Sequence, residues 1–251
     1  RITKQGEVAQ ALSMYRDFGA FGPMKSATMG DLSLKLARPR NQTRVPVTLP
    51  DGSNLFVRAS GQVNGTGILT IANGASIDLR DGTLGAKVTN QGTILVRTAS
   101  AVANAAIVND TGGLLEIRGD NTFTDATFTI NAAVTNRGII ELKAEPGFNG
   151  DSTGDDATLV ISGATLTNEA AGTIKSLASA TNGAVNARRI RGDVNNQGTI
   201  EVDDSLTFDE VGKTLTHSGT LPSPVSFPSS SQVRLNVAMV PPPLGPPSKK
   251  R

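Results

Sequence analysis

One short pattern of hydrophobic and polar positions recurs along the chain: an apolar residue, a polar residue, Asn, a short gap, Gly and an apolar strand. The segments around it alternate apolar and polar residues, so each predicts a short β-strand with one buried and one exposed face. No helical period lies between these strands, which excludes a βαβ fold. Four full copies of the pattern begin at Val88, Val134, Leu166 and Val194, and looser copies begin at Val63, Val108 and Leu215.

The Asn of this pattern is expected to have a structural role. In parallel strands stacked about 4.8 Å apart, identical side chains on successive strands form a row. An Asn amide can hydrogen-bond to the amides above and below it, and the Gly that follows leaves room for the turn. The markers are 19 to 32 residues apart, roughly the length of three short strands with variable loops. The expected row consists of Asn64, Asn90, Asn109, Asn136, Asn168, Asn196 and, in the last copy, His217.

These features predict an all-β fold, a right-handed parallel β-helix or solenoid over residues 45–221, in which each coil stacks only on its neighbours. Aromatic residues make up 4% of the chain and Trp is absent, which fits a narrow core of aliphatic side chains. Residues 1–44 lack the repeat, and apolar residues three or four positions apart between Val8 and Phe18 predict a helical cap or linker. The Pro- and Ser-rich residues 222–251 predict a disordered tail.

Charge divides along the same boundaries. Residues 1–44 carry a net charge of +5 and residues 222–251 a net charge of +4, whereas residues 45–221 carry 12 basic and 19 acidic residues, a net charge of −7. An acidic body repels phosphates, so nucleic acid is not an expected partner. No apolar stretch reaches the roughly 18 residues of a membrane-spanning helix. The chain has no Cys and one His, which excludes disulfides and thiolate metal sites and argues against a Ser-His-Asp triad. No cofactor is expected.

Paired carboxylates are the one catalytic arrangement that this composition supplies. If the chain is an enzyme, its expected catalytic residues are Glu116, Glu141, Glu201 and Asp203, because carboxylates one or two strands apart lie roughly 5–10 Å from each other. A regularly charged row is also what a solvated outer face looks like, so both interpretations stay open. Counted from the Gly of the pattern, the exposed row is expected to run Thr70, Leu95, Glu116, Glu141, Lys175, Glu201.

Two further clusters of polar residues are weaker candidates for a functional site. The loop over residues 149–156 is rich in oxygen donors, and Asp151, Asp155 and Asp156 are the candidate Ca²⁺ ligands, although the spacing matches no known calcium loop. The densest basic cluster consists of Arg188, Arg189 and Arg191, whose spacing predicts a surface loop. No other metal site is expected.

The repeats from Val88 to Ile94 and from Val194 to Ile200 resemble those of large bacterial surface and secreted proteins of the filamentous-haemagglutinin or autotransporter-passenger type. The resemblance covers about residues 45–221. It implies a right-handed parallel β-helix that is exported to the cell surface or beyond and serves as a rigid stalk, an adhesin or a polysaccharide-contacting rod. Because the chain begins with Arg1 and shows no signal-peptide pattern, we expect it to be a fragment or a processed form.

Two functions from different classes fit this sequence. The first is a non-enzymatic extracellular segment that contacts a polysaccharide or a host or neighbouring cell surface, which charges spread evenly over the coils would favour. The second is a β-helical polysaccharide lyase or glycoside hydrolase, which two or three carboxylates gathered with an Arg in one groove would favour. An ice- or mineral-binding surface is not expected, because the exterior positions do not read as regular Thr rows.

Overall fold

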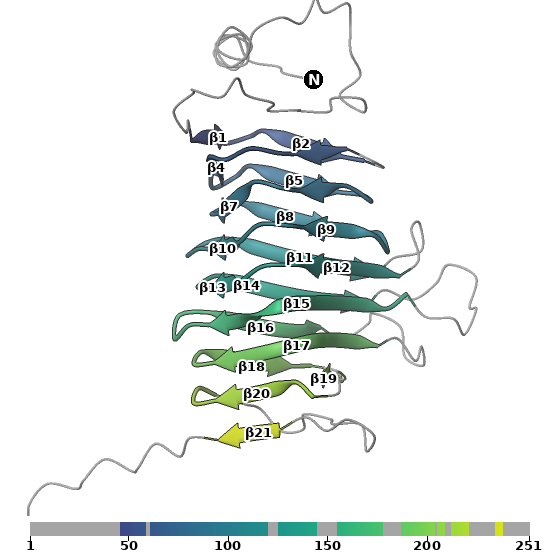
Figure 1. The fold of residues 1–251 in the computed structure, drawn as a ribbon, viewed down its shortest axis with the longest axis vertical. Helices are drawn as coiled ribbons and strands as arrows, with labels where there is room; N and C mark the ends of the chain where they lie inside the picture. The colour runs from purple at the N-terminus through teal and green to yellow at the C-terminus, as the bar shows by residue number, and fades with distance from the viewer. Residues whose placement is uncertain are drawn as a thin grey trace, which may run out of the picture.

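The structure, a computed structural model, contains only β-strands as regular elements among its described residues. Every strand pair within these residues is parallel. Figure 1 shows the strands stacked one below another in chain order. The predicted all-β class with parallel strands is therefore confirmed, whereas the predicted helical cap over residues 1–44 lies outside the described part. The structure describes residues 46–58, 61–119, 125–144, 155–177, 187–203, 205–208 and 212–220, and the backbone of 234–237.

A seven-stranded sheet takes one strand from each successive repeat. Most of its strands pair with strands three elements away in the chain, which is the pattern expected when each repeat contributes three short strands. Its members, in spatial order, are β2 (Asn54–Val57), β5 (Ser76–Leu79), β8 (Thr93–Val96), β11 (Leu114–Gly119), β14 (Ile139–Ala144), β16 (Thr173–Leu177) and β18 (Thr199–Val202).

A fourteen-stranded sheet holds the remaining strands in two series. Two long strands, β15 (Ala157–Asn168) and β17 (Arg188–Asn196), belong to both series and join them. The first series also contains β1 (Val47–Leu49), β4 (Ile68–Ile71), β7 (Lys87–Asn90), β10 (Ile107–Asn109), β13 (Val134–Asn136), β20 (Thr214–His217) and β21 (Arg234–Val237). The second series also contains β3 (Gln62–Val63), β6 (Thr83–Leu84), β9 (Ala101–Ala103), β12 (Ala126–Ile130) and β19 (Thr207–Phe208).

The last strand, β21, lies inside the segment predicted to be a disordered tail. It pairs in parallel with β20, with Leu235 opposite Leu215 and Val237 opposite His217. The expectation is therefore wrong for these four residues, because their alternation of Arg, Leu, Asn and Val suits a strand and no Pro interrupts it. The rest of residues 222–251 lies outside the described part.

The repeated pattern marks the corner between the two sheets. Its Asn ends a strand of the first series, as Asn90 ends β7, and its Gly precedes a strand of the seven-stranded sheet. A Cβ on Gly92 would lie 2.3 Å from the carbonyl oxygen of Ala75, and one on Gly138 would lie 2.3 Å from that of Gly113. The corner of one repeat thus rests directly on the backbone of the repeat before it, and only Gly fits there.

Aliphatic side chains fill the interior between the sheets. In the seven-stranded sheet, the inward residue of each strand pairs with its counterpart on the next, which creates a continuous aliphatic row with no exposed surface. Burying one such side chain stabilises the fold by roughly 1.5–3 kcal/mol. Among the described residues, two Phe side chains, Phe128 and Phe208, join this core. The aliphatic row consists of Ile77, Ile94, Leu115, Ile140, Ile174 and Ile200.

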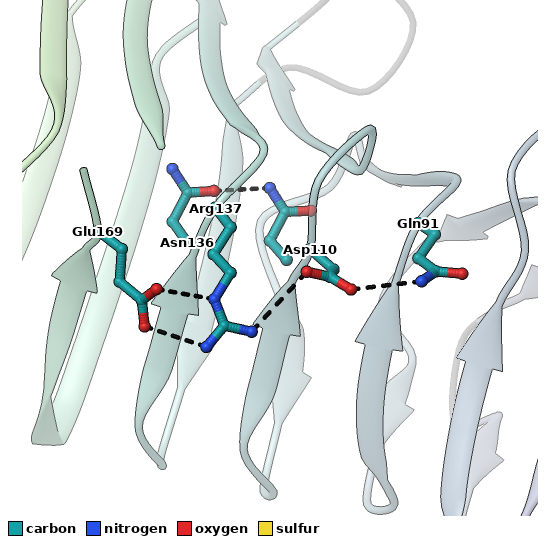
Figure 2. Close-up of polar contacts among 6 residues, drawn as sticks. Gln91, Asp110, Asn136, Arg137 and Glu169 are labelled. Atoms are coloured by element: carbon teal, nitrogen blue, oxygen red, sulfur yellow. Dashed lines mark hydrogen bonds and ion pairs between the residues drawn. The ribbon is translucent and has the colours of Figure 1, made fainter. Parts of the chain in front are cut away.

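A second inward row is polar, and we call it the asparagine row. Each Asn side chain in it is fully buried and donates a hydrogen bond from Nδ2 to Oδ1 of the Asn on the next repeat, at 2.6–2.7 Å. The last Asn, Asn196, donates to Nδ1 of His217 at 2.8 Å. All the bonds run in the same direction along the stack, and Figure 2 draws the one that the labelled Asn136 accepts. The row contains Asn90, Asn109, Asn136, Asn168, Asn196 and His217.

The second N–H of each amide is used as well. Asn90 Nδ2 donates to the carbonyl oxygen of Leu114 at 2.9 Å, and Asn109 Nδ2 donates to that of Ile139 at 2.9 Å. These carbonyls belong to the strand that follows the corner of the next repeat. Each amide therefore ties two repeats together and leaves no buried N–H without an acceptor, which is the condition for placing a polar group in a core.

Asn64, which the sequence pattern placed in this row, is not part of it. Ile71 stands opposite Asn90 and ends the row. Asn64 instead lies between β3 and β4, where its Nδ2 donates to Oε1 of Gln62 at 2.7 Å. The looser copy of the pattern at this point precedes a strand of the fourteen-stranded sheet, so it forms a different corner of the repeat and its Asn is partly exposed.

We predict that Asn136→Ala lowers the free energy of unfolding by about 3 kcal/mol or more, because it leaves one side-chain N–H of Asn109 and the side-chain oxygen Oδ1 of Asn168 buried without the partners they have now. The matched control Asn64→Ala should change it by less than about 0.5 kcal/mol, because that side chain makes an exposed contact. Urea unfolding followed by circular dichroism measures both. Equal losses in the two variants would contradict the role given to the asparagine row.

Candidate functional site: the outer face of the seven-stranded sheet

Three outward rows cross the strands of the seven-stranded sheet, and each holds one residue per strand in register. The first row runs Asn54, Ser76, Thr93, Leu114, Ile139, Thr173, Thr199. The second row runs Phe56, Asp78, Leu95, Glu116, Glu141, Lys175, Glu201. The third row, two residues further along each strand, runs Arg58, Arg80, Arg97, Arg118, Lys143, Leu177, Asp203.

Most of the second row was expected from the sequence, but Thr70 does not belong to it. Thr70 lies on β4 and pairs with Thr89 in the fourteen-stranded sheet. Asp78 takes the place beside Leu95. Counting from Gly67 selected the wrong strand, because this Gly lies at a different corner of the repeat.

Two carboxylates of this row are nearly buried rather than exposed. Asp78 is 5% exposed and Glu116 is 8% exposed. In each case the Arg two residues later on the same strand covers the carboxylate: Arg80 Nε donates to both oxygens of Asp78 at 3.0 Å, and Arg118 Nε donates to Glu116 at 2.6 Å. The signal for this arrangement is an acidic residue two positions before an Arg, which places both side chains on one face of a strand.

Glu116 and Glu141 stand directly opposite each other on β11 and β14. Burial raises the pKa of Glu141, and the negative charge of Glu116 raises it further, while Lys175, Lys143 and Arg118 act in the opposite direction. These two residues are therefore the one pair of expected catalytic carboxylates that the sheet brings side by side. Arg118 holds Glu116 as an ion pair.

The other two expected carboxylates lie further along the sheet. Glu201 on β18 accepts a salt bridge from Lys175 Nζ at 3.0 Å, and this contact raises the pKa of Lys175. Asp203 is exposed at the end of the third row, where its backbone N–H donates to the carbonyl oxygen of Ser176 at 2.9 Å. One strand, β16, lies between Glu201 and Glu141, which puts them two strand spacings apart, roughly 10 Å. The four carboxylates therefore do not converge on one point.

A shallow groove of about 360 Å³ lies over the first and second rows. Leu114 and Ile139 form an apolar floor, and Ile139 is 38% exposed. Glu141, Lys175 and Arg137 bring charged groups to the groove. Its volume is at the lower end of the range typical of small-ligand sites. An aliphatic floor beside hydrogen-bonding groups suits a sugar ring, which has an apolar face and hydroxyl edges.

An ordered polar network on the corners next to this groove holds Arg137 in place, as Figure 2 shows. Arg137 donates from Nε and Nη2 to the two oxygens of Glu169 at 2.7 and 3.2 Å, and its Nη1 lies 3.8 Å from Asp110. The Thr111 backbone N–H and the amide of Gln91 lower the pKa of Asp110, with a smaller effect of Arg137. Exposed contacts of this kind stabilise a fold only weakly, so their main effect is to position Arg137.

The candidate calcium loop is described only in part, because Asp151 lies outside the described residues. Asp156 accepts a hydrogen bond from the Ala187 backbone N–H at 2.7 Å and forms an ion pair with Arg189. Asp155 is 5% exposed. The described residues contain no group of three or more His, Cys, Asp or Glu side chains placed to hold a metal ion. A cation at Asp156 would have to compete with the guanidinium of Arg189.

The basic cluster expected on a surface loop instead forms the start of β17. Arg188 is 1% exposed and is the largest fully buried side chain of the described chain. Arg189 points outward to Asp156, and Arg191 is exposed. The alternation of buried and exposed side chains shows a regular strand. The sequence did not indicate this strand, because three Arg residues in four positions suggest a surface loop and a buried guanidinium is rare.

The fourteen-stranded sheet presents an outward row that is rich in threonine. Val108 and Asn195 interrupt it, so it is not the regular Thr row whose absence was expected. Its neighbouring outward positions include Ile68, Lys87 and Asp193, so the threonines form a single row and not a broad array. The row runs Thr48, Thr70, Thr89, Val108, Thr135, Thr167, Asn195, Thr216.

His217 ends the asparagine row as an acceptor, which requires a neutral ring with a lone pair on Nδ1. Burial lowers the pKa of His217, and a hydrogen bond with the Gly219 backbone opposes this effect. A protonated ring would bring two donors face to face at Asn196. The end of the row is therefore sensitive to acid.

No protein-family model matches the chain, and neither a curated protein nor a solved structure shows detectable similarity to it. The described residues include no helix that is both long and apolar enough to cross a membrane.

We predict that the contribution of His217 to stability is complete above its unfolded pKa of about 6.5 and is lost as the pH falls below that value. The sign follows from the lowered pKa in the folded chain, since the unfolded chain then binds the proton more tightly. His217→Asn is the control, because Asn completes the row without titrating. The urea midpoint of the wild type should fall relative to that of the variant between pH 8 and pH 5. A constant difference between the two would contradict the prediction.

Proposed function

We propose that this chain forms a right-handed parallel β-helix and is a non-enzymatic structural or adhesive segment of an exported bacterial surface protein. Its outer rows contact an extended partner, of which a polysaccharide fits best. The winding is supported by three strands per repeat, parallel pairing throughout and Gly corners that rest on the repeat before. The location at the cell surface is supported by the likeness of the repeated phrase to bacterial surface proteins.

The observation that carries this proposal is the distribution of charge on the seven-stranded sheet. Acidic and basic side chains pair strand by strand, as Asp78 with Arg80, Glu116 with Arg118, and Glu201 with Lys175. An active site gathers such groups around one reacting bond, whereas a rod spreads them along its length. The groove lined by Leu114 and Ile139 is one place on this face where a sugar ring can lie against an apolar surface beside charged groups.

A second function has one specific observation in its favour. Glu141 has a raised pKa and lies opposite Glu116 across adjacent strands. A carboxyl group with a raised pKa beside a second carboxylate is what a glycosidase uses as acid and nucleophile. Glu116 forms an ion pair with Arg118. This ion pair would have to break before the Glu116 carboxylate could act as a nucleophile or a base.

The full chain incubated with a panel of neutral and acidic polysaccharides distinguishes the two functions. We predict retention on at least one polysaccharide, with no new reducing ends and no unsaturated products. Cleavage that disappears in Glu116→Gln and Glu141→Gln would overturn the proposal in favour of the enzyme. The absence of both retention and cleavage would also contradict it, because the rod would then contact no polysaccharide of the panel.

A further inference from the structure

The third outward row of the seven-stranded sheet begins with five basic residues on five successive strands. Arg118 and Lys143 are paired across β11 and β14. The others follow the last paired residues of β2, β5 and β8 by one position. Successive strands are about 4.8 Å apart, so this run is a line of closely spaced positive charges on a body that is otherwise acidic. The run consists of Arg58, Arg80, Arg97, Arg118 and Lys143.

Two of these Arg residues are paired in the same way. Arg80 binds the carboxylate of Asp78, and Arg118 binds that of Glu116, in each case two residues earlier on the same strand. Strand β8 lies between these two strands, and the equivalent position there is Leu95. The carboxylate that the pattern would supply to Arg97 is therefore missing.

The contacts of Arg97 differ from those of Arg80 and Arg118, as expected when this carboxylate is absent. It forms no hydrogen bond or ion pair with any described residue, and its Nε is buried without a hydrogen-bond partner. Its side chain as a whole is partly exposed. The Nε–H is closed off from solvent, so an external ligand meets this guanidinium only at its remaining N–H groups, for which the described residues supply no acceptor.

We propose that Arg97 and Leu95 form a subsite for a carboxylate-bearing sugar of an extended acidic polysaccharide. The two terminal nitrogens of a guanidinium, Nη1 and Nη2, bind a carboxylate in two-point geometry. Leu95 is partly exposed and gives the sugar ring an apolar surface. This inference rests on the proposed contact with polysaccharide and names the class of its ligand.

A second cation extends the subsite across the sheet. Arg58 is exposed two strands from Arg97, roughly 10 Å away, and its guanidinium lies 5.6 Å from the ring centroid of Phe56. It has no carboxylate on its own strand either, because Phe56 takes the position that Asp78 has on β5. A polymer that crosses the strands can therefore place one carboxylate at Arg97 and a second at Arg58.

The same face does not suit a nucleic acid. Single-stranded nucleic acids bind through aromatic side chains on which the bases stack. The described aromatic side chains are Phe128 and Phe208, which are buried, and Phe56, whose ring is approached by the guanidiniums of both Arg58 and Arg80. The acidic body also repels the dense phosphates of a nucleic acid more strongly than widely spaced carboxylates.

The test measures binding of the full chain to polygalacturonate and to neutral dextran, with Arg97→Gln and Leu95→Glu as variants. Both variants should weaken polygalacturonate binding by about tenfold or more, since one removes the cation and the other supplies an internal carboxylate to it. Leu95→Glu should keep the melting temperature of the wild type, because Arg97 then has the partner that Arg80 and Arg118 have. Lys87→Gln removes an exposed cation from the other sheet and should change binding by less than about twofold.

Unchanged binding in Arg97→Gln and Leu95→Glu would overturn the inference, and so would an equal loss in Lys87→Gln, which would indicate attraction by net charge alone. Tighter binding of a single-stranded oligonucleotide than of polygalacturonate would overturn it as well. If polygalacturonate binding is unchanged in these variants but the chain still binds dextran, this inference fails while the proposed rod stands. Cleavage of polygalacturonate by the wild type would instead contradict the proposed function.

Discussion

The structure depends on one constraint: parallel strands stack at a fixed spacing, so whatever one repeat places inside must be matched by the next. Aliphatic rows meet this condition easily, because any β-branched side chain packs on another. The asparagine row meets it with polar groups, since each amide donates to the next at 2.6–2.7 Å. A different residue in the middle of the row would leave buried donors and acceptors on both sides, so the Asn specifies the register as well as contributing stability.

The outer rows are free of this constraint, and function can reside there. Most outward side chains are at least partly exposed, so their pairwise contacts are weak. The nearly buried Asp78 and Glu116 are each covered by the Arg two residues later. The seven-stranded sheet can therefore change from Phe56 through Asp78 to Leu95 within three strands without disturbing the core. The proposed subsite uses this freedom: the outward Leu95, in place of an acidic residue, leaves Arg97 without the carboxylate on its own strand that Arg80 and Arg118 have.

The interior was more predictable than the surface. Asn90, Asn136 and Asn196 could be placed because their strict repetition reflects the stacking condition itself. Asn64 could not, because a repeat with three similar corners offers three places for an Asn followed by Gly, and local sequence does not distinguish them. Thr70 was misplaced for the same reason. The burial of Arg188 could not be read from a sequence in which Arg is ordinarily a surface residue.

The sequence predicted most of the residues that lie in the outer row, but it did not predict which of them are covered or whether they converge on one point. Alternation within a strand correctly placed Glu116, Glu141 and Lys175 in one row. A carboxylate of this row is covered where an Arg follows it two residues later. The distance between carboxylates is set by the number of strands between them. Both properties arise from pairing between repeats that are distant in sequence, so a single strand does not reveal them.

Hydrogen exchange of the Asn side-chain amides, followed by nuclear magnetic resonance, tests the central claim most directly. The account predicts that the side-chain N–H groups of Asn109, Asn136 and Asn168 exchange with solvent only on unfolding, while those of Asn64 exchange freely. Exchange of all four at the same fast rate would show that the asparagine row does not hold the stack together.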